Sequence, residues 1–173
     1  MDIPNKYLEV IEPLIAKARG FVEGGEKLAP IAFVGNFTTE QILPVVINTS
    51  DDDSKDNSAF AIQMTAAKLE ADFVFTIMEA WGLPKDKIDR YEQILDRYGS
   101  IGNSPYKVDT ASFTLETHHG IWGAQELLKP KGYSKKKRTF GQLTFRHMDG
   151  AEGRFVGLLP VRKDEPSGGA SLQ

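Results

Sequence analysis

The stretch that most constrains the fold of this chain runs from residue 71 to residue 82, Ala-Asp-Phe-Val-Phe-Thr-Ile-Met-Glu-Ala-Trp-Gly. Between residues 73 and 78 it is apolar on both faces and rich in the aromatic and β-branched residues that favour a pleated strand. A strand that is apolar on both faces is usually central in its sheet, with other elements covering it above and below. We therefore expect residues 73–78 to form a central strand.

Glu79 follows this apolar run, and alternation places it on the same face as Ile77 and Trp81. A carboxylate in apolar surroundings needs hydrogen-bond donors, or it holds its proton. Three interpretations stay open. Glu79 can be a structural acceptor for a backbone N–H or the Trp81 indole, a functional acid or base, or an exposed residue where the strand leaves the sheet.

Composition indicates a globular protein. The 173 residues are 40% apolar and 26% charged, which is ordinary for a globular domain and long enough to bury a substantial core. We expect one domain over residues 1–162, followed by a disordered tail over 163–173 that is rich in Gly, Ser and charged residues.

Several classes of function are disfavoured by the same composition. The 21 basic and 24 acidic side chains give a net charge of -3, so nothing attracts the whole chain to nucleic acid or to an anionic membrane. The absence of cysteine excludes disulfides, thiolate chemistry and Cys-based zinc sites. No apolar run approaches the roughly 20 residues of a membrane helix, and the first residues lack a signal-peptide pattern. We expect a cytoplasmic protein without membrane contact.

Helical spacing of apolar residues predicts three helices. The first covers residues 4–23, where Pro13 should kink or split it. The second covers 58–71, after an acidic turn at 51–56, and Asp56 or Ser58 can cap it. A further helix is expected over 84–98, starting at a proline and ending at Gly99. The apolar face of the second helix consists of Phe60, Met64, Ala67 and Ala71.

The remaining apolar segments alternate with polar residues or end at turn residues, as strands do. Residues 30–35 and 42–48 read as a hairpin, and Pro44 places its second strand at an edge or a bulge. Further strands are expected over 108–117, 121–128, 139–147 and 154–160.

These elements predict an α+β fold. It consists of a mostly antiparallel sheet of about seven strands, with the helices over 4–23 and 58–71 on one face and an extra helix at 84–98. Segregated helices and strands rich in hairpins argue against a doubly wound parallel sheet.

The three histidines are the next side chains to consider for catalysis. His118 and His119 are adjacent, so their side chains diverge in a strand, and His147 lies near another hairpin tip. Because no set of ligands converges by spacing, we predict no metal and no cofactor. Glu79, His119 and His147 are the catalytic candidates. The chain has no nucleophile elbow and no phosphate-binding glycine loop.

A basic segment over residues 129–138 places six cations around one tyrosine. Such a segment can hold a phosphate backbone. The alternative is a solvated loop whose charge keeps flanking strands from pairing edge to edge, and the acidic balance of the whole chain favours this alternative. The possible anion-binding residues are Lys131, Lys135, Lys136, Lys137 and Arg138.

The element order resembles a group of uncharacterised bacterial and phage proteins. In those proteins a helix leads into an Ala-Asp-apolar strand that closes in Ser-Glu-Ala-Trp, followed by a strand and a Gly-containing turn. Here Met78 stands in place of the Ser, before Glu79-Ala80-Trp81, and Gly120 follows Glu116-Thr117. The resemblance covers roughly residues 28–128. It implies a cytoplasmic protein of bacterial or phage origin, with no known activity and no catalytic residues to transfer.

The leading hypothesis for function is a binding or assembly module without catalysis, acting on a protein partner or by self-association. The second is a small hydrolase-like enzyme that uses Glu79 with a histidine. The third is a nucleic-acid accessory protein that uses the loop at 129–138.

Overall fold

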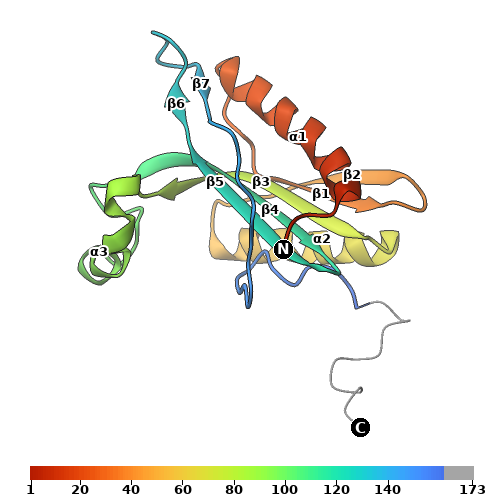
Figure 1. Ribbon diagram of the computed structural model, residues 1–173. Helices are drawn as coiled ribbons and strands as arrows, with labels where there is room; N and C mark the ends of the chain where they lie inside the picture. The colour runs from red at the N-terminus through yellow and green to blue at the C-terminus, as the bar shows by residue number, and fades with distance from the viewer. Residues whose placement is uncertain (162–173) are drawn as a thin grey trace.

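Strand β3 (Phe73–Gly82) lies in the middle of a six-stranded sheet in the computed structural model, which describes residues 1–161 (Figure 1). The strand order is β2-β1-β3-β4-β5-β8, and every neighbouring pair is antiparallel. The first five residues of β3 are all buried, which confirms the predicted central strand. The α+β class is confirmed too. The tail predicted over 163–173 lies outside the described residues.

The other strands match the predicted ones in part. The segments predicted over 108–117 and 121–128 are real strands, but 139–147 holds only two short strand ends, and 154–160 is irregular. Those two predictions were wrong because alternation in these segments reflects packing against the sheet, without a ladder of hydrogen bonds. The strands besides β3 are β1 (Ile31–Asn36), β2 (Gln41–Val46), β4 (Val108–Thr117), β5 (Gly120–Leu127), β6 (Lys129–Pro130), β7 (Arg138–Thr139) and β8 (Arg146–His147).

Strand β2 forms one edge of the sheet, as Pro44 predicts. The Ile47 N–H donates to the Pro30 carbonyl at 2.9 Å, and the direction of hydrogen bonds alternates along a strand. Pro44, three residues earlier, therefore turns its missing donor to the open side. The gap at Pro44 interrupts the row of free backbone groups along this edge, which discourages edge-to-edge pairing.

The two long helices lie on opposite faces of the sheet, and the prediction that they share one face was wrong. Helix α1 (Asn5–Glu23) packs with the side chains of Phe73, Phe75 and Ile77. Helix α2 (Asp52–Leu69) packs with Val74 and Met78, the alternate residues of the same strand. Figure 1 shows α1 above the sheet and α2 below it. The physical reason is β3 itself, because a strand apolar on both faces needs cover on both.

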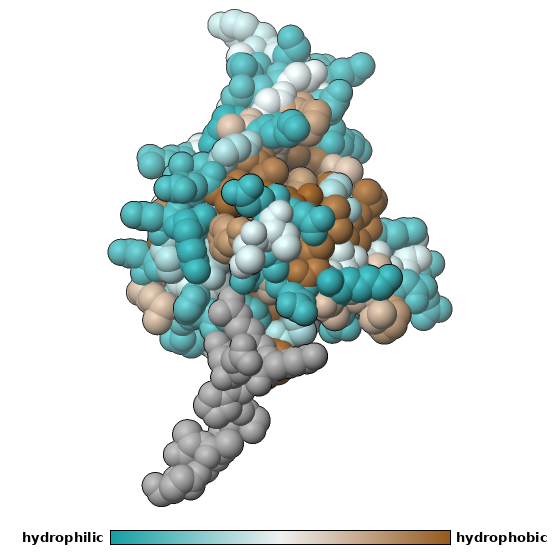
Figure 2. Space-filling view, turned by 90° about the vertical axis from the view of Figure 1, so that its right-hand side faces the viewer, coloured by the Kyte–Doolittle hydropathy of each residue, from teal (hydrophilic) through white to brown (hydrophobic). Residues whose placement is uncertain are grey.

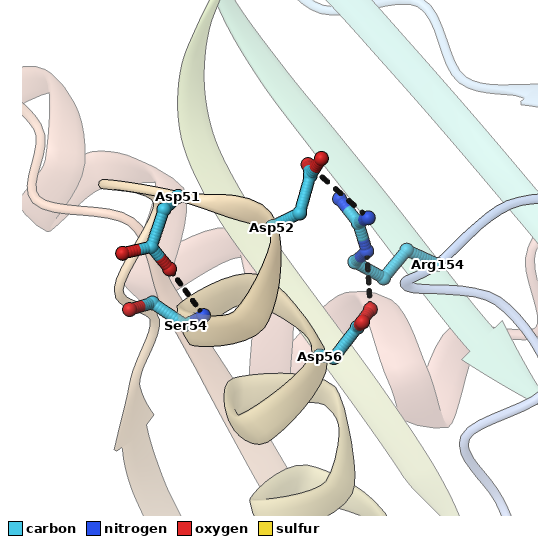
Figure 3. A network of polar contacts seen from close by, with 5 residues as sticks. All are labelled: Asp51, Asp52, Ser54, Asp56 and Arg154. Carbon is cyan, nitrogen blue, oxygen red and sulfur yellow. Dashed lines mark hydrogen bonds and ion pairs between the residues drawn. The ribbon is translucent and has the colours of Figure 1, made fainter.

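Helix α2 begins six residues before the predicted start, within the acidic run. The Asp51 carboxylate accepts a hydrogen bond from the Ser54 N–H at 2.6 Å, so Asp51 is the N-cap, and neither Asp56 nor Ser58 fills that role. Arg154 contacts Asp56 at 2.7 Å and Asp52 at 3.4 Å (Figure 3). The acidic run is therefore the first turn of a helix, where negative charge is stabilising.

The face that α2 turns to the sheet also differs from the predicted one. Its buried residues are Ser58, Ala59, Ile62 and Ala66. Phe60 is 62% exposed and Met64 is 45% exposed. The helix carries two apolar stripes, and the stripe of smaller side chains faces the sheet because it allows the closer approach.

The remaining helical segments lie where the sequence predicts them. Helix α1 continues through Pro13 as one helix, so the split that the proline allowed does not occur. The helix expected over 84–98 is a 3-10 turn, η1 (Lys85–Arg90), that leads into α3 (Tyr91–Tyr98). Among the helices of residues 1–161, none combines the length and apolarity that crossing a membrane requires.

The irregular segment 140–161 completes both cores. Phe140 and Phe145 pack on the α1 side, whereas Phe155 and Leu158 pack on the α2 side. Between them, β8 pairs with β5 at the edge opposite β2. This segment therefore covers the part of the sheet that the two helices leave open.

Candidate binding groove

A groove of about 230 Å³ lies between α1, the connector that follows it, and β1. Eight of its eleven lining residues are apolar. Phe21 stands at its side and is 47% exposed, while Ile77 of β3 belongs to the buried core beneath it. Ligand sites are concave and largely apolar with a few polar groups, and this groove has that character.

Three charged side chains complete the lining: Lys17 on α1, and Glu26 and Lys27 in the connector. All three residues are exposed. The two lysines outnumber the single carboxylate, so the rim carries a net positive charge. An apolar floor with a cationic rim suits a segment that has both an apolar side chain and acidic neighbours.

The apolar surface continues from the groove onto β2. Ile31 faces Val46, and Phe33 faces Pro44, across the β1–β2 ladder. Directly opposed residues share one face of a sheet, so Val46 and Pro44 extend the groove side, and both are exposed. Figure 2 views the molecule from the right-hand side of Figure 1, and its hydrophobic area lies in the middle of that face with hydrophilic residues around it.

Glu79 supports one wall of the groove. Its Oε1 accepts a hydrogen bond from the Leu28 N–H at 3.1 Å, and Leu28 lines the groove. Arg138 donates to the same oxygen at 2.5 Å. The Glu79 side chain is 24% exposed. Of the three interpretations left open by the sequence, this geometry is that of a structural acceptor for a backbone N–H.

The basic segment is a hairpin that projects from the body (Figure 1). Two of its five predicted anion-binding residues have carboxylate partners: Arg138 pairs with Glu79, and Lys131 pairs with Glu23 at 3.2 Å. Lys135, Lys136 and Lys137 are exposed, as is Tyr133 at the tip. The structure therefore uses part of this charge to hold the hairpin against the protein.

Glu23, at the end of α1, is the other anchor for this hairpin. The Thr139 hydroxyl donates to the Glu23 carboxylate at 2.9 Å. This hydrogen bond and the Lys131 ammonium hold the pKa of Glu23 below its usual value of 4.5. Nearby, the Arg19 guanidinium donates to the Phe140 carbonyl and lies over the Phe140 ring. These contacts fix α1, one side of the groove, to the segment after the hairpin.

The histidines lie at the other end of the sheet. His118 contacts the Ala71 carbonyl at 3.2 Å, and the ring of His119 lies 6.3 Å from that of Tyr7. The ring of His147 lies 5.3 Å from that of Trp122, and its Nδ1 is 3.0 Å from Asp149. Each ring therefore has a packing or hydrogen-bonding partner away from the groove.

Register separates Glu79 from the two histidines proposed to act with it. Glu79 lies opposite Ala111, which lies opposite Glu126 on β5, whereas His147 lies opposite Trp122. Glu79 and His147 are therefore separated by four residues along the strands and by three strand spacings across the sheet. Together these amount to about 20 Å. His119 follows Thr117, which faces Phe73 six residues from Glu79, or about 20 Å along the strand. The structure does not bring the three catalytic candidates together.

No group of three or more potential metal ligands of the His, Cys, Asp or Glu type occurs within residues 1–161. The β5–β8 pairing does place His147 beside the turn that carries His119, since a Cβ at Gly120 would lie 2.6 Å from His147 Nε2. That juxtaposition alone is no metal centre.

Sequence reasoning missed Glu116, the second structural carboxylate. It is 7% exposed and accepts hydrogen bonds from the Gly157 N–H at 2.7 Å and the Leu158 N–H at 2.9 Å. Alternation placed Glu116 among polar residues of a half-buried strand, and nothing in the sequence marks 157–158 as its cover. No local signal could have identified it.

Comparison with known protein families, with curated proteins and with solved structures gives no match. The resemblance to bacterial and phage proteins stays a prediction.

Proposed function

We propose that this protein is a non-catalytic binding module, and that the groove between α1 and β1 receives an apolar side chain of a partner protein. The observation that carries the proposal is the groove itself, with its apolar lining and exposed Phe21. A cytoplasmic location and a bacterial or phage origin belong to the proposal as well, as expected from the sequence.

The size of the groove favours a protein segment as occupant. Sites for drug-sized ligands span about 300–1,000 Å³, and this groove is smaller, at about 230 Å³. One or two large side chains fill a space of this kind. Such pockets receive the few anchor residues that dominate the energy of protein interfaces.

The surroundings of the groove supply the rest of an interface. Pro44 and Val46 extend the apolar area over β2, and Lys17 and Lys27 lie at the rim. Lysines at a rim contribute to specificity and to the rate of association more than to affinity. We therefore expect a partner segment with one or two large apolar residues next to Asp or Glu.

Glu79 takes part in this function as a positioning residue. Through the Leu28 N–H it fixes the connector that forms one wall of the groove, and Arg138 holds its carboxylate in place. A preformed wall lowers the cost of ordering on binding.

Selection from a phage-displayed library of random peptides tests the proposal. We expect enriched peptides to combine a large apolar residue with acidic neighbours. Binding of a synthetic enriched peptide should weaken at least about tenfold in Phe21→Ala, as loss of an anchor contact does. Charge reversal of Lys17 and Lys27 should also weaken binding of this peptide relative to the unmodified protein. Added salt should then no longer weaken the binding, because no attraction between opposite charges is left to screen.

Phe60→Ala is the matched control, because Phe60 is also an exposed phenylalanine on a helix but lies on the opposite side of the sheet. Its affinity for the peptide should equal that of the unmodified protein. A library that yields no enrichment, or peptides that bind Phe21→Ala as tightly as the unmodified protein, would contradict the proposal.

Nucleic acid is not part of the proposed function. We expect no binding of duplex or single strand by the exposed lysines of the hairpin at about 150 mM salt, where weak phosphate contacts are screened. Tight, salt-sensitive binding that disappears when Lys135, Lys136 and Lys137 are replaced with Gln would favour the nucleic-acid hypothesis instead.

A further inference from the structure

A second apolar surface lies on the outer side of α2, away from the groove. Phe60, Met64 and Ala67 recur at intervals of four and three residues, so they share one face of the helix. All three are exposed, while the opposite face carries the buried Ala59, Ile62 and Ala66. We call Phe60, Met64 and Ala67 the outer stripe.

The outer stripe makes α2 apolar on both sides. A helix with apolar residues all round is usually covered on both sides, but the sheet covers only one side of α2. Figure 1 shows α2 below the sheet, with the blue irregular segment at the end of the described chain also on the lower side. The outer stripe is therefore an apolar surface that stays exposed in the described part of the chain.

Charged residues stand at both ends of the outer stripe. Lys68 follows Met64 by four residues and Asp53 precedes Phe60 by seven, or two turns, so both lie on the face of the outer stripe. Asp56, four residues before Phe60, lies on this face too, but Arg154 holds its carboxylate. Within residues 1–161 the structure records ion pairs for Asp52 and Asp56 but none for Asp53 or Lys68. Figure 3 shows how the neighbours are used: Asp51 caps the helix, and Asp52 and Asp56 hold Arg154. Among the described residues, Asp53 is the one aspartate of this turn without such a local role.

This arrangement of charge is self-complementary. If two copies of α2 cross antiparallel with the midpoint between Phe60 and Met64 on the two-fold axis, the acidic end of each outer stripe meets the basic end of the other. Asp53 is nine residues from that midpoint and Lys68 is six, so the axial offset is about 4.5 Å, which a lysine side chain can span. The helix dipoles also oppose each other favourably.

We propose that α2 is the interface of a symmetric homodimer, in which the outer stripes of two copies pack antiparallel. Phe60 of one copy lies against Met64 of the other, and Asp53 pairs with Lys68 at both ends. In such an isologous interface each contact occurs twice.

The dimer should be weak. Helix α2 has 18 residues, which gives a length of about 27 Å. Two such helices bury an interface at the lower end of the sizes found in specific complexes. We therefore expect a concentration-dependent equilibrium.

Sedimentation equilibrium of the full chain up to about 1 mM tests the proposal, since self-association with a Kd below that value is then visible. We expect dimers for the unmodified protein and monomers for Phe60→Glu. The control is Ile88→Glu, because Ile88 has a similar exposure of 58% and lies in η1. It should dimerise like the unmodified protein. Circular dichroism should show the same fold for all three proteins.

Charge exchange provides the sharper test. Asp53→Lys and Lys68→Asp should each weaken self-association about tenfold or more, because both pairs in the dimer become repulsive. Mixing the two variants should restore association as a heterodimer. In it, the lysine introduced at position 53 meets the aspartate introduced at position 68, and the unchanged Lys68 meets the unchanged Asp53. A structural defect in either variant would not be repaired by mixing.

Three outcomes would overturn the proposal. These are a monomer at every concentration, a dimer that persists in Phe60→Glu, and a mixture of the charge variants that associates no better than either alone.

Discussion

The two faces of the sheet are built from side chains of different size. On the α1 face the largest buried side chains are aromatic: Phe73, Phe75, Phe113 and Trp122. On the α2 face the buried residues of β1 and α2 are mostly alanine and valine, with Ile62 as the largest in the helix. Bulky rings support α1 over the centre of the sheet and leave a groove beside it over β1. Small side chains let α2 lie close, and its larger side chains point outward.

On each face, a carboxylate of a central strand, Glu79 of β3 or Glu116 of β4, anchors an irregular segment. Glu79 holds the connector at Leu28 and has a cation, Arg138, beside it. Glu116 holds Gly157 and Leu158 with backbone donors alone and is more deeply buried. Because buried groups depend more on their partners than exposed ones do, Glu116 should matter more for stability and Glu79 more for the shape of the groove.

The largest expected effect is loss of an aromatic ring from the α1 face. Phe75→Ala should lower the free energy of unfolding by about 3–5 kcal/mol, and Ile62→Ala on the α2 face by about 2–4 kcal/mol, as for other buried side chains of these sizes. Urea titration measures both. A cost below about 1 kcal/mol for Phe75→Ala would mean that β3 is not the centre of the core.

Replacement of Glu116 should come next. Glu116→Leu leaves the buried Leu158 N–H and the partly buried Gly157 N–H without an acceptor, and we expect a cost of about 2–4 kcal/mol. Glu116→Gln retains one carbonyl acceptor and should cost about half as much. Hydrogen exchange at Gly157 and Leu158 provides a local readout, since both amides should lose protection in the Leu variant. If Glu116→Leu is neutral, the segment over 155–159 is not held as described.

Replacement of Glu79 should have a smaller effect because the group is partly solvated. Glu79→Gln keeps an acceptor for the Leu28 N–H and should lower the free energy of unfolding by at most about 1.5 kcal/mol. Glu79→Leu leaves both donors, the Leu28 N–H and the Arg138 guanidinium, without an acceptor and should cost more. The comparison of the two faces requires that Glu79→Leu cost less than Glu116→Leu. The reverse order, or a stabilising Glu79→Leu, would contradict it.

The smallest effect concerns acid pH and the start of α2. The Ser54 N–H lowers the pKa of the Asp51 carboxyl below its usual 3.8. A carboxyl with a lowered pKa in the folded state stabilises the protein above its unfolded pKa, and this contribution is lost as pH falls through the folded pKa. Asn caps helices about as well as Asp. Asp51→Asn should therefore match the unmodified protein at neutral pH and lose less stability below about pH 4 in thermal unfolding, with Asp53→Asn as control.

The fold could be predicted from the sequence where a pattern of residues is compatible with only one structure. The doubly apolar run at 73–78 specified a central strand, and Pro44 specified an edge. The orientation of α2 could not be predicted, because Phe60–Met64 and Ala59–Ile62–Ala66 are both apolar stripes, and only the sheet decides between them. The start of α2 was missed because Asp51 and Asp56 are both residues that can cap a helix.

The candidate site was less accessible to sequence reasoning. Alternation identified Glu79 as a residue that needs partners, but its donors, Leu28 and Arg138, are 51 and 59 residues away. The groove depends on α1 and β1 packing at a distance that no local pattern encodes. The two predicted features that do meet, Glu79 and the basic segment, meet as a structural ion pair.

The central claim is that the groove, and neither α2 nor the basic hairpin, binds the partner. Mapping of backbone amide chemical shifts on addition of an enriched peptide tests this most directly. The account predicts the largest changes over residues 14–21 and 26–33, with β6, β7 and the outer stripe unchanged. Changes confined to the outer stripe or to residues 129–139, with the groove unperturbed, would contradict it.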